Sequence, residues 1–412
     1  MPYTKVQAGI RGFMLVLRAS ILALGVLPLP ALAQDAAQLF QPAPSRPASA
    51  SDSIPMVRAA PDTPPVPTAR PTPEIRSTES DTETPPTPSP RPPVTYEPQK
   101  VAFADGVSAQ FDIPYASLDG FRTLTLDIYT PKPRPGPLLP MVLYIHGGGW
   151  NSGDSRHAPA FGDFPRALAG LAAQGYLVAS LNYRLSQEAR FPAALQDVKA
   201  AIRWLRGHAG VYSGDPTRLA VWGMSAGGQL AAMAGATCGV MHFEPEGNIG
   251  YDAPSDCAEA VIDWFGPTDL ENLADDNGKP AKDGFVAAGA KTDEGSYLGC
   301  EPAACAPGVV KLASPQAFVS ESTPPFLIQH GAADTSVSPK QSQRLYDALK
   351  KKGVPAEIVL YPDAGHDFLK DDSPDTATVT MAMAKLTAFL VATFPNTLVK
   401  PSAHQAAKPD RK

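Results

Sequence analysis

The sequence has no cluster of basic residues. Its 35 lysines and arginines are outnumbered by 41 aspartates and glutamates, which gives a formal net charge of −6. Proteins that bind nucleic acids neutralise phosphates with patches of Lys and Arg, so a nucleic-acid partner is not expected. The mixed apolar and charged content beyond residue 98 also excludes a fibrous or fully disordered chain.

Residues 34–98 contain almost no aromatic side chains and many prolines. The chain has 46 prolines among its 412 residues, against a usual share of about 5%, and 17 of them lie between Pro42 and Pro98. Such a segment buries too little apolar surface to offset its ordering entropy. We predict a Pro-rich disordered linker at 34–98, one large domain at 99–398 and a polar tail at 399–412.

Only one apolar run, near the N-terminus, comes close to the length that spans a bilayer, and its dozen residues fall short of the ~20 required. This run, residues 21–32, follows three basic residues and overlaps a small-x-small sequence at 31–33. These features are typical of a cleaved secretory signal. No cysteine follows the run, which excludes a lipid-attachment site. We predict a signal peptide at 1–33 and an exported protein, periplasmic or secreted, which contacts a membrane only if the signal is retained as an anchor.

Cysteine is scarce, and no two cysteines have the C-x-x-C spacing of a metal site. The four cysteines are Cys238, Cys257, Cys300 and Cys305. An even number in an exported chain favours disulfides, and four cysteines allow three pairings. Short loops favour the pairs Cys238–Cys257 and Cys300–Cys305, and no metal is expected.

From residue 99 the sequence alternates short apolar runs with helical patterns. Two runs, 107–115 and 123–130, alternate like antiparallel strands. They are followed by buried-type strands at 138–145, 176–181, 219–222, 260–265, 326–329 and 357–361, and by helices at 191–206, 226–234, 339–352 and 375–394. This pattern predicts an α/β fold with a mainly parallel central sheet, helices on both faces and an N-terminal antiparallel hairpin. Residues 269–312 have no clear period and are expected to be an insertion, either a surface excursion or part of a pocket.

The strongest chemical signal is a G-x-S-x-G sequence around Ser225, between a predicted strand and a predicted helix. This is the nucleophile elbow in the context that it requires. Gly223 and Gly227 let the chain fold back sharply, and the start of the following helix presents free N–H groups and a positive dipole end to negative charge. Ser225 is therefore the candidate nucleophile.

A serine nucleophile needs a histidine base and a carboxylate that orients it. Of the seven histidines, His366 lies between the last predicted strand and the last helix, at the carboxyl edge of the sheet. Asp334 follows the preceding strand and projects from the same edge, whereas Asp263 and Asp269 are rivals one strand earlier. His330 ends a buried strand and is predicted to be a structural histidine.

A glycine loop, Gly147-Gly148-Gly149, follows another buried strand. It matches the HGGG-type loop whose backbone N–H groups bind the oxyanion of acyl transfer, with the N–H of Ala226 as a third donor. The ring of His146, which opens this loop, is expected to hold it by hydrogen bonds.

Taken together, these motifs resemble the α/β-hydrolase superfamily. More narrowly, residues from about 120 to 395 resemble the bacterial esterases with an HGGG oxyanion loop, related to hormone-sensitive lipase and to acetyl-xylan and feruloyl esterases. The motifs that carry the resemblance are HGGGW, NYRLS, FPAALQDVKAAIRWLR, GMSAGGQLAA, HGAADTSVSPKQS and AGHDF. The resemblance implies a catalytic triad of Ser225, Asp334 and His366. It also implies an oxyanion hole formed by the amides of Gly148, Gly149 and Ala226.

These expectations describe an exported serine carboxylesterase that works through a covalent acyl-enzyme and needs no cofactor. The family likeness implies short acyl groups, including acetyl or feruloyl groups, on a small-molecule or polysaccharide-linked ester. Two alternatives stay open, a serine peptidase of the prolyl-oligopeptidase type and a non-catalytic binding protein on the same fold. The HGGG loop favours esters over peptides, and the presence of all three triad candidates disfavours a binding protein.

Overall fold

The computed structural model describes residues 98–244, 254–278, 292–306, 308–371 and 373–395. The predicted signal peptide at 1–33, the linker apart from its last residue and the polar tail at 399–412 lie outside the described residues. Those predictions therefore stay predictions, and the fold below concerns the domain that was expected at 99–398.

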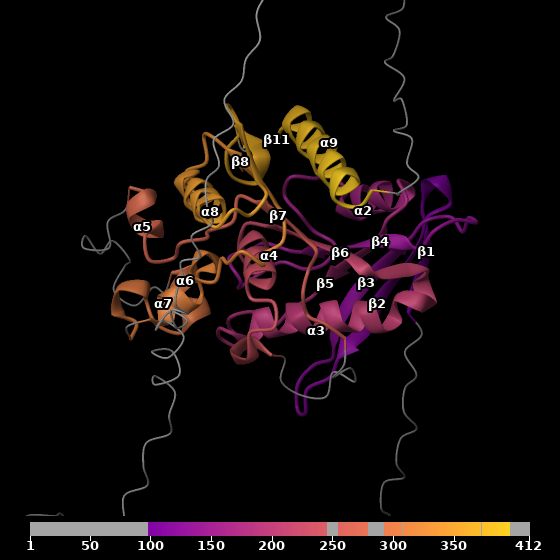
Figure 1. The fold of residues 1–412 in the computed structure, drawn as a ribbon, viewed down its shortest axis with the longest axis horizontal. Coiled ribbons are helices and arrows are strands. Elements are labelled where there is room, and N and C mark those ends of the chain that lie inside the picture. Colours follow the sequence, from indigo (N-terminus) through magenta and orange to yellow (C-terminus); the bar gives the residue numbers. More distant parts are fainter. Residues whose placement is uncertain (1–97, 245–253, 279–291, 307, 372, 396–412) are drawn as a thin grey trace, which may run out of the picture. The chain divides into compact units, whose positions relative to one another are not determined.

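A nine-stranded sheet runs through this domain (Figure 1). Its strands are β1 (Gln99–Ala102), β2 (Ser108–Ala116), β3 (Leu124–Thr130), β4 (Leu139–Ile145), β5 (Leu177–Leu181), β6 (Gly214–Met224), β7 (Ala260–Trp264), β8 (Phe326–Gly331) and β9 (Ala356–Tyr361). Their spatial order is β1-β2-β3-β5-β4-β6-β7-β8-β9. The pairs from β1 to β5 are antiparallel, and all pairs from β5 to β9 are parallel.

Helices cover both faces of the sheet. They are α2 (Phe164–Ala173), α3 (Ala193–His208), α4 (Ala226–Ala236), α8 (Lys340–Lys351) and α9 (Thr376–Thr393). Alternate residues of β4 belong to two cores: Leu143 packs in the core that includes α3, α4 and α8, and Tyr144 packs in the core with α2 and α9. Such burial on both faces explains why the parallel strands are continuous apolar runs. The predicted fold class is therefore confirmed.

In the central sheet and the helices that cover it, strand β1 and helix α2 were not predicted. The short edge strand β1 has no buried residue, so its sequence has no clear alternation of apolar and polar side chains. Helix α2 does have start signals, because the side chain of Asp163 accepts a hydrogen bond from the N–H of Arg166 and Pro165 lies in the first turn. Strand β6 also begins five residues before its predicted start at 219.

The insertion predicted at 269–312 lies between β7 and β8. In its described part it forms the short helices α5 (Leu273–Asp276), α6 (Asp293–Leu298) and α7 (Val309–Leu312). Short 3-10 turns occur at Ala104–Gly106, Ala209–Tyr212, Met241–Phe243, Pro302–Ala304, Pro315–Ala317 and His366–Phe368, and a two-residue hairpin joins β10 (Leu369–Lys370) to β11 (Ser373–Pro374).

Both predicted disulfide pairings are present. One bond joins Cys238 to Cys257, which connects the end of α4 to the start of β7, and the other joins Cys300 to Cys305 in the insertion. The second bond closes a loop directly after α6, so it restrains the segment of the insertion that reaches the candidate site.

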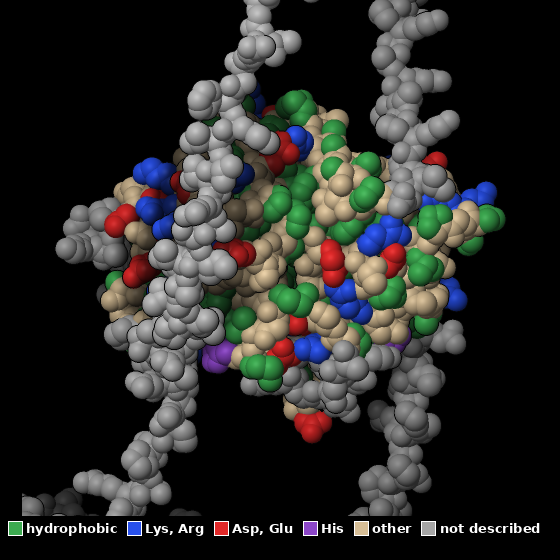
Figure 2. Space-filling view, in the orientation of Figure 1, with side chains coloured by type: hydrophobic (Ala, Val, Ile, Leu, Met, Phe, Trp, Pro, Cys, Tyr) green, Lys and Arg blue, Asp and Glu red, His purple; other side chains and the backbone are tan. Residues whose placement is uncertain are grey.

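Helix α9 is long and apolar enough to cross a bilayer by length and composition, which the sequence analysis did not expect. In this fold it packs against the sheet through Val379, Ala382, Leu386 and Leu390, and the carbonyl of Ala382 accepts a hydrogen bond from Gln329 of β8. Apolar side chains gather at the surface around α9 (Figure 2), in agreement with the exposure of Met381. One face of α9 therefore belongs to the core of the domain, and its other face is exposed.

Candidate active site

The candidate site residues follow four parallel strands at the same edge of the sheet. The glycine loop 147–149 follows β4, Ser225 follows β6, Asp334 follows β8 and His366 follows β9. In an open parallel sheet, ligand sites form outside the carboxyl ends of the strands. The topology thus brings residues from four distant parts of the sequence to one place.

Ser225 stands in a strained turn between β6 and α4. Its backbone has φ 54° and ψ −122°, a conformation that non-glycine residues rarely adopt. Its N–H donates to the carbonyl of Trp264 at 2.9 Å, which fixes the turn against β7. A Cβ on Gly223 would lie 1.9 Å from the carbonyl oxygen of Gly227, so the first residue of the motif has to be glycine. This geometry is the predicted nucleophile elbow.

A chain of two hydrogen bonds links the three triad candidates. The hydroxyl of Ser225 lies 2.9 Å from Nε2 of His366, and Nδ1 of the same ring lies 2.7 Å from Oδ2 of Asp334. Because a carboxylate can only accept, Nδ1–H donates to Asp334, which leaves Nε2 free to accept the serine proton. The structure therefore assembles these three residues in the arrangement of a nucleophile, a base and an orienting acid.

The carboxylate of Asp334 is buried and saturated with donors. Its Oδ1 accepts from the N–H groups of Ser336 and Val337 at 2.8 and 2.9 Å. Its Oδ2 accepts from Nε2 of His330 at 3.2 Å as well as from His366. Burial alone would raise the pKa of Asp334, but these hydrogen bonds and the nearby histidines hold it well below its ordinary range. The carboxylate of Asp334 is therefore ionised at neutral pH.

The same contact sets the basicity of His366. Burial of the imidazole lowers its pKa, but the hydrogen bond to Asp334 and the charge of that carboxylate outweigh burial, so that the pKa of His366 lies above its ordinary value. Asp367 contributes in the same direction. A stronger base removes the serine proton more readily once the ring is neutral.

The glycine loop packs directly against the elbow. A Cβ on Gly147 would lie 2.8 Å from the carbonyl oxygen of Met224 and 3.3 Å from the Cβ of Ser225. Only a residue without a side chain allows this approach. The loop amides predicted to bind the oxyanion are thereby kept beside the nucleophile.

His146 supports this loop as predicted. Its Nδ1–H donates to the carbonyl of Gly147 at 2.8 Å, and its ring stacks on Tyr183 with 4.1 Å between the ring centroids. Burial lowers the pKa of His146 to about 4, although the hydrogen bond acts in the opposite direction. The ring is therefore neutral at neutral pH and adds no charge to the site.

A cavity of about 530 Å³ opens over the nucleophile. Its wall includes Ser225 and His366 together with the predicted oxyanion residues Gly148, Gly149 and Ala226. The insertion contributes a second wall with Asp293 and Glu294. Of the two interpretations of the insertion, the described part of the structure supports a role in shaping the pocket.

The insertion is fastened to the glycine loop by two contacts. The indole of Trp150 stacks on the ring of Tyr297 with 4.4 Å between centroids and an interplanar angle of 7°. The carboxylate of Asp293 accepts a hydrogen bond from the side-chain amide of Asn151 at 2.5 Å. Helix α6 is thus part of the site rather than a separate surface feature.

Comparison with known families identifies the chain. The sequence model of the family described as BD-FAE matches residues 126–349. The chain belongs to the BD-FAE family. A second model, of the prolyl oligopeptidase family, matches residues 307–397 only.

Proteins similar to this chain are named esterases. The chain is 31% identical to "Esterase LipQ" of Mycobacterium tuberculosis over 266 residues, which cover 62% of this chain and 56% of the relative. It thus spans just over half the length of the curated relative. This member of the BD-FAE family also resembles the solved structure "Truncated form of carbohydrate esterase from gut microbiota". The two are 29% identical with a TM-score of 0.56, and the match covers 71% of this chain and 98% of the other. A third similar structure is the butyrate-bound esterase Est2 of Thermogutta terrifontis, with 27% identity, a TM-score of 0.54 and coverage of 69% and 94%. The resemblance expected from the motifs is confirmed.

The structure also separates Asp334 from its rivals. Asp269 binds the backbone and side chain of Asn272, and Asp263 accepts from the N–H of Gly266. Neither carboxylate has a contact with His366 among the described residues. Asp263 is fully buried, and burial raises its pKa to about 6. In this family member the carboxylate on the histidine comes from the loop after β8.

Two histidines have contacts that the sequence did not reveal. His330 is a buried structural histidine as predicted, and its Nδ1 accepts from the hydroxyl of Ser342 at 2.6 Å. It also donates to Asp334, a contact that its position directly after the predicted strand 326–329 could not show. His157 is exposed; it lines the cavity, and its Nδ1 lies 2.8 Å from the carboxylate of Asp154.

No group of three or more His, Cys, Asp and Glu side chains that could hold a metal ion occurs within the described ranges. The cavity wall includes the hydroxyl of Ser225, the imidazole of His366 and the residues of the glycine loop. These are the groups that acyl transfer uses.

Proposed function

We propose that this protein is an exported serine carboxylesterase. The observation that carries the proposal is the hydrogen-bonded chain from Ser225 through His366 to Asp334, at the floor of a cavity bordered by the glycine loop. The names of the relatives support an ester as the substrate class. A binding protein on this fold would not need a buried, fully hydrogen-bonded carboxylate behind an accessible base.

In the proposed mechanism, Nε2 of His366 takes the hydroxyl proton of Ser225 while Oγ attacks the ester carbonyl. The resulting oxyanion is bound by the backbone N–H groups of Gly148, Gly149 and Ala226. The protonated imidazole then gives its proton to the leaving alcohol, and an acyl-enzyme remains. Water, deprotonated by the same ring, hydrolyses that ester and restores Ser225.

We propose short acyl groups, with a small-molecule or polysaccharide-linked alcohol. The structures similar to this chain include one named a carbohydrate esterase and an esterase with bound butyrate. A cavity of about 530 Å³ has room for a short acyl group and part of the alcohol. A series of p-nitrophenyl esters from acetyl to decanoyl, run beside acetylated and feruloylated xylan, would test this. Maximal kcat/KM for long acyl chains would contradict it.

A peptidase is the second candidate, because the prolyl oligopeptidase model matches residues 307–397. That range contains Asp334 and His366 but not Ser225 or the glycine loop. The part of the chain that binds the acyl group therefore belongs to the esterase-like match alone. Paired assays on a short acyl ester and an aminoacyl anilide decide between the two, and preferential cleavage of the anilide would favour the peptidase.

The activity should fall in acid as His366 becomes protonated. Since its pKa lies above the ordinary 6.5, the acid limb of kcat/KM should have its midpoint above pH 6.5. Asp367→Asn removes a nearby negative charge without touching the bond to Asp334, so its midpoint should move to lower pH. Rates measured between about pH 5 and 9 in buffers of constant ionic strength test both expectations. A rate that does not change across this range would argue against His366 as the base.

Export remains a prediction from the N-terminal sequence. If it is right, expression with the full leader should yield a mature protein outside the cytoplasm whose first residue is Gln34, as intact mass would show. All candidate site residues lie beyond residue 98, so a variant lacking 34–98 should keep its kcat/KM. An intact signal in the purified protein would indicate a retained anchor, and loss of activity in the shortened variant would contradict the interpretation of 34–98 as a linker.

A further inference from the structure

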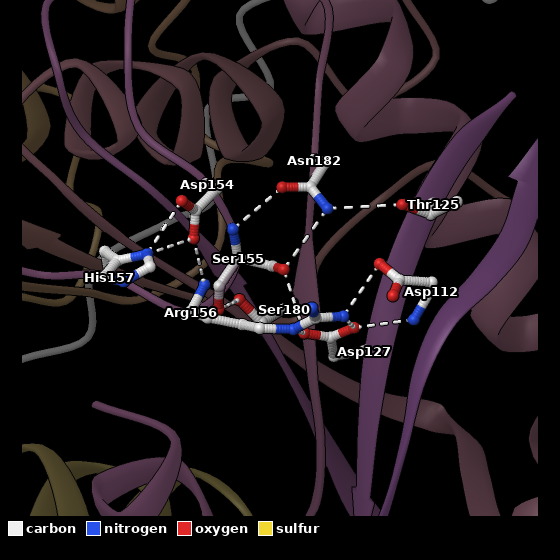
Figure 3. Close-up of polar contacts among 9 residues, drawn as sticks. All are labelled: Asp112, Thr125, Asp127, Asp154, Ser155, Arg156, His157, Ser180 and Asn182. Carbon is white, nitrogen blue, oxygen red and sulfur yellow. Dashed lines mark hydrogen bonds and ion pairs between the residues drawn. The ribbon is translucent and has the colours of Figure 1, made fainter. Parts of the chain in front are cut away.

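A buried carboxylate belongs to a polar network that joins strands β2, β3 and β5 to residues 154–157 (Figure 3). Asp127 of β3 is fully buried and accepts four hydrogen bonds. Its Oδ1 accepts from the N–H of Asp112 at 2.8 Å and from Nη2 of Arg156 at 2.9 Å. Its Oδ2 accepts from the hydroxyl of Ser155 at 2.9 Å and from Nε of Arg156 at 2.8 Å. Such a donor set compensates the cost of burying a charge.

Ser155 is the residue that this network immobilises most completely. Its N–H donates to Oδ1 of Asn182 at 2.8 Å, and its carbonyl accepts from the hydroxyl of Ser180 at 2.7 Å. Its hydroxyl donates to Asp127 and accepts from the amide of Asn182 at 3.2 Å. Every polar atom of this buried residue therefore has a partner on β3, on β5 or directly after β5. Figure 3 shows these partners surrounding Ser155.

The residues just before Ser155 contact the glycine loop. The N–H and the hydroxyl of Ser152 both donate to the carbonyl of Gly148, each at 3.0 Å. A Cβ on Gly153 would lie 2.6 Å from Nδ1 of His146 and 2.7 Å from the carbonyl oxygen of Gly147. The chain at 152–153 is thus packed against two of the three loop glycines, with Ser155 as its fixed end.

The geometry points to Asp127 as a positioning residue for the oxyanion loop. Asp127 holds Ser155, and Ser155 fixes the position of residues 152–153. These two residues pack against Gly147 and Gly148 and thereby keep the glycine loop beside the turn at Ser225. This inference rests on the proposed function, because the loop has an oxyanion to bind only if the protein hydrolyses esters. Asp127 itself is buried on β3 and is absent from the cavity wall, so it acts on the reaction only through the loop.

The effect of changing Asp127 on kcat and KM can be estimated from the contribution of oxyanion donors to catalysis. Oxyanion donors have to be held to within about 0.5 Å, and loss of one donor lowers kcat by on the order of a hundredfold to a thousandfold. A displaced loop loses part of that interaction in the transition state, where the negative charge develops, and much less in the ground state. Disturbance of Asp127 should therefore lower kcat and leave KM nearly unchanged.

Asp127→Asn is the variant that tests this inference. The amide has the size of the carboxylate, but in either orientation its NH₂ group faces two donors. Arg156 loses one acceptor in both orientations, and the second group that loses its acceptor is the hydroxyl of Ser155 or the N–H of Asp112. We expect kcat per active site, titrated with a fluorophosphonate, to fall by about tenfold or more, with KM within about twofold of wild type. The acid midpoint of the pH profile should stay in place, because the triad is untouched. Ser155→Ala should act in the same direction and decides the question if Asp127→Asn does not fold.

Asp112→Asn is the matched control. The Asp112 carboxylate pairs with the same Arg156 at 2.8 Å on the partly exposed side, and its N–H bond to Asp127 survives the change. Its backbone has φ 57°, which Asn adopts readily. This control should keep kcat within about twofold of wild type.

The outcomes are distinguishable. The inference is overturned if folded Asp127→Asn keeps kcat per active site, if only KM rises, or if Asp112→Asn loses as much activity as Asp127→Asn. It is also overturned if Ser155→Ala, measured alone, keeps the wild-type kcat. If the wild-type protein hydrolyses no ester in this assay, the proposed function fails and not the structural link between Asp127 and the loop.

Discussion

Replacement of Ser225 by alanine should lower ester hydrolysis by on the order of a thousandfold or more, the loss expected when a triad member is removed. The hydroxyl of Ser225 lies 2.9 Å from Nε2 of His366 and lines the cavity, so its removal leaves the imidazole without the proposed nucleophile. The measurement is kcat/KM on a short p-nitrophenyl ester, together with covalent labelling by a fluorophosphonate. The variant should be both inactive and unlabelled.

Ser336→Ala is a suitable control for this variant. Ser336 belongs to the same cavity wall, but its contact with Asp334 is made by the backbone N–H, which alanine retains. Its kcat/KM should stay within a few-fold of wild type. Full activity of Ser225→Ala would remove the proposed nucleophile. Absence of both activity and labelling in the wild-type protein would favour the binding-protein alternative.

The strands and the main helices of the fold were predictable because burial shapes their sequences. A strand that is buried on both faces is a continuous apolar run, and a helix that is buried on one face repeats its apolar residues every three to four positions. Strand β4 is fully buried along its length, and the sequence accordingly shows an uninterrupted apolar run there. Strand β1 has no buried face, so nothing in its sequence distinguishes it from a loop. Helix α2 was not predicted, although the sequence contains its N-cap residue Asp163 and the first-turn proline Pro165.

The triad candidates were predictable because they follow the order of the strands. Ser225, Asp334 and His366 each come directly after a predicted parallel strand, and the topology places such positions at one edge. The choice between Asp334 and Asp269 could not be settled in that way, since both follow parallel strands. The deciding contact, the 2.7 Å bond from His366, depends on the path of two loops.

The supporting contacts were not predictable, because they join residues that no local pattern relates. Asp127 lies in an ordinary strand sequence, and Ser155 in a loop 28 residues further along. The stacking of Trp150 on Tyr297 joins the residue after the glycine loop to the insertion, and the sequence of the insertion has no period that would predict this contact. Side-chain networks of this kind follow from tertiary packing, so they become visible only in the folded chain.

A second large effect is expected at the elbow itself. In Gly223→Ala the new methyl group would lie 1.9 Å from the carbonyl oxygen of Gly227 and 2.7 Å from the N of Gly228. Both are backbone atoms at the start of α4, so the clash can be relieved only by moving the strand, the helix or Ser225. We expect a loss of unfolding free energy of about 3 kcal/mol or more. We also expect kcat/KM of the folded fraction to fall at least about a hundredfold, because a displacement of about 1 Å at the nucleophile suffices for that.

Gly170→Ala separates this clash from the general effect of replacing glycine. Gly170 lies in α2, is exposed and has no atom within 4 Å of an added Cβ. Alanine there should stabilise the protein by about 0.5–1 kcal/mol, because glycine weakens a helix interior, and activity should not change. Urea unfolding and steady-state rates on both variants give the comparison. If Gly223→Ala were as stable and active as Gly170→Ala, the backbone at Ser225 could not have the tight, strained turn on which the proposed nucleophile depends.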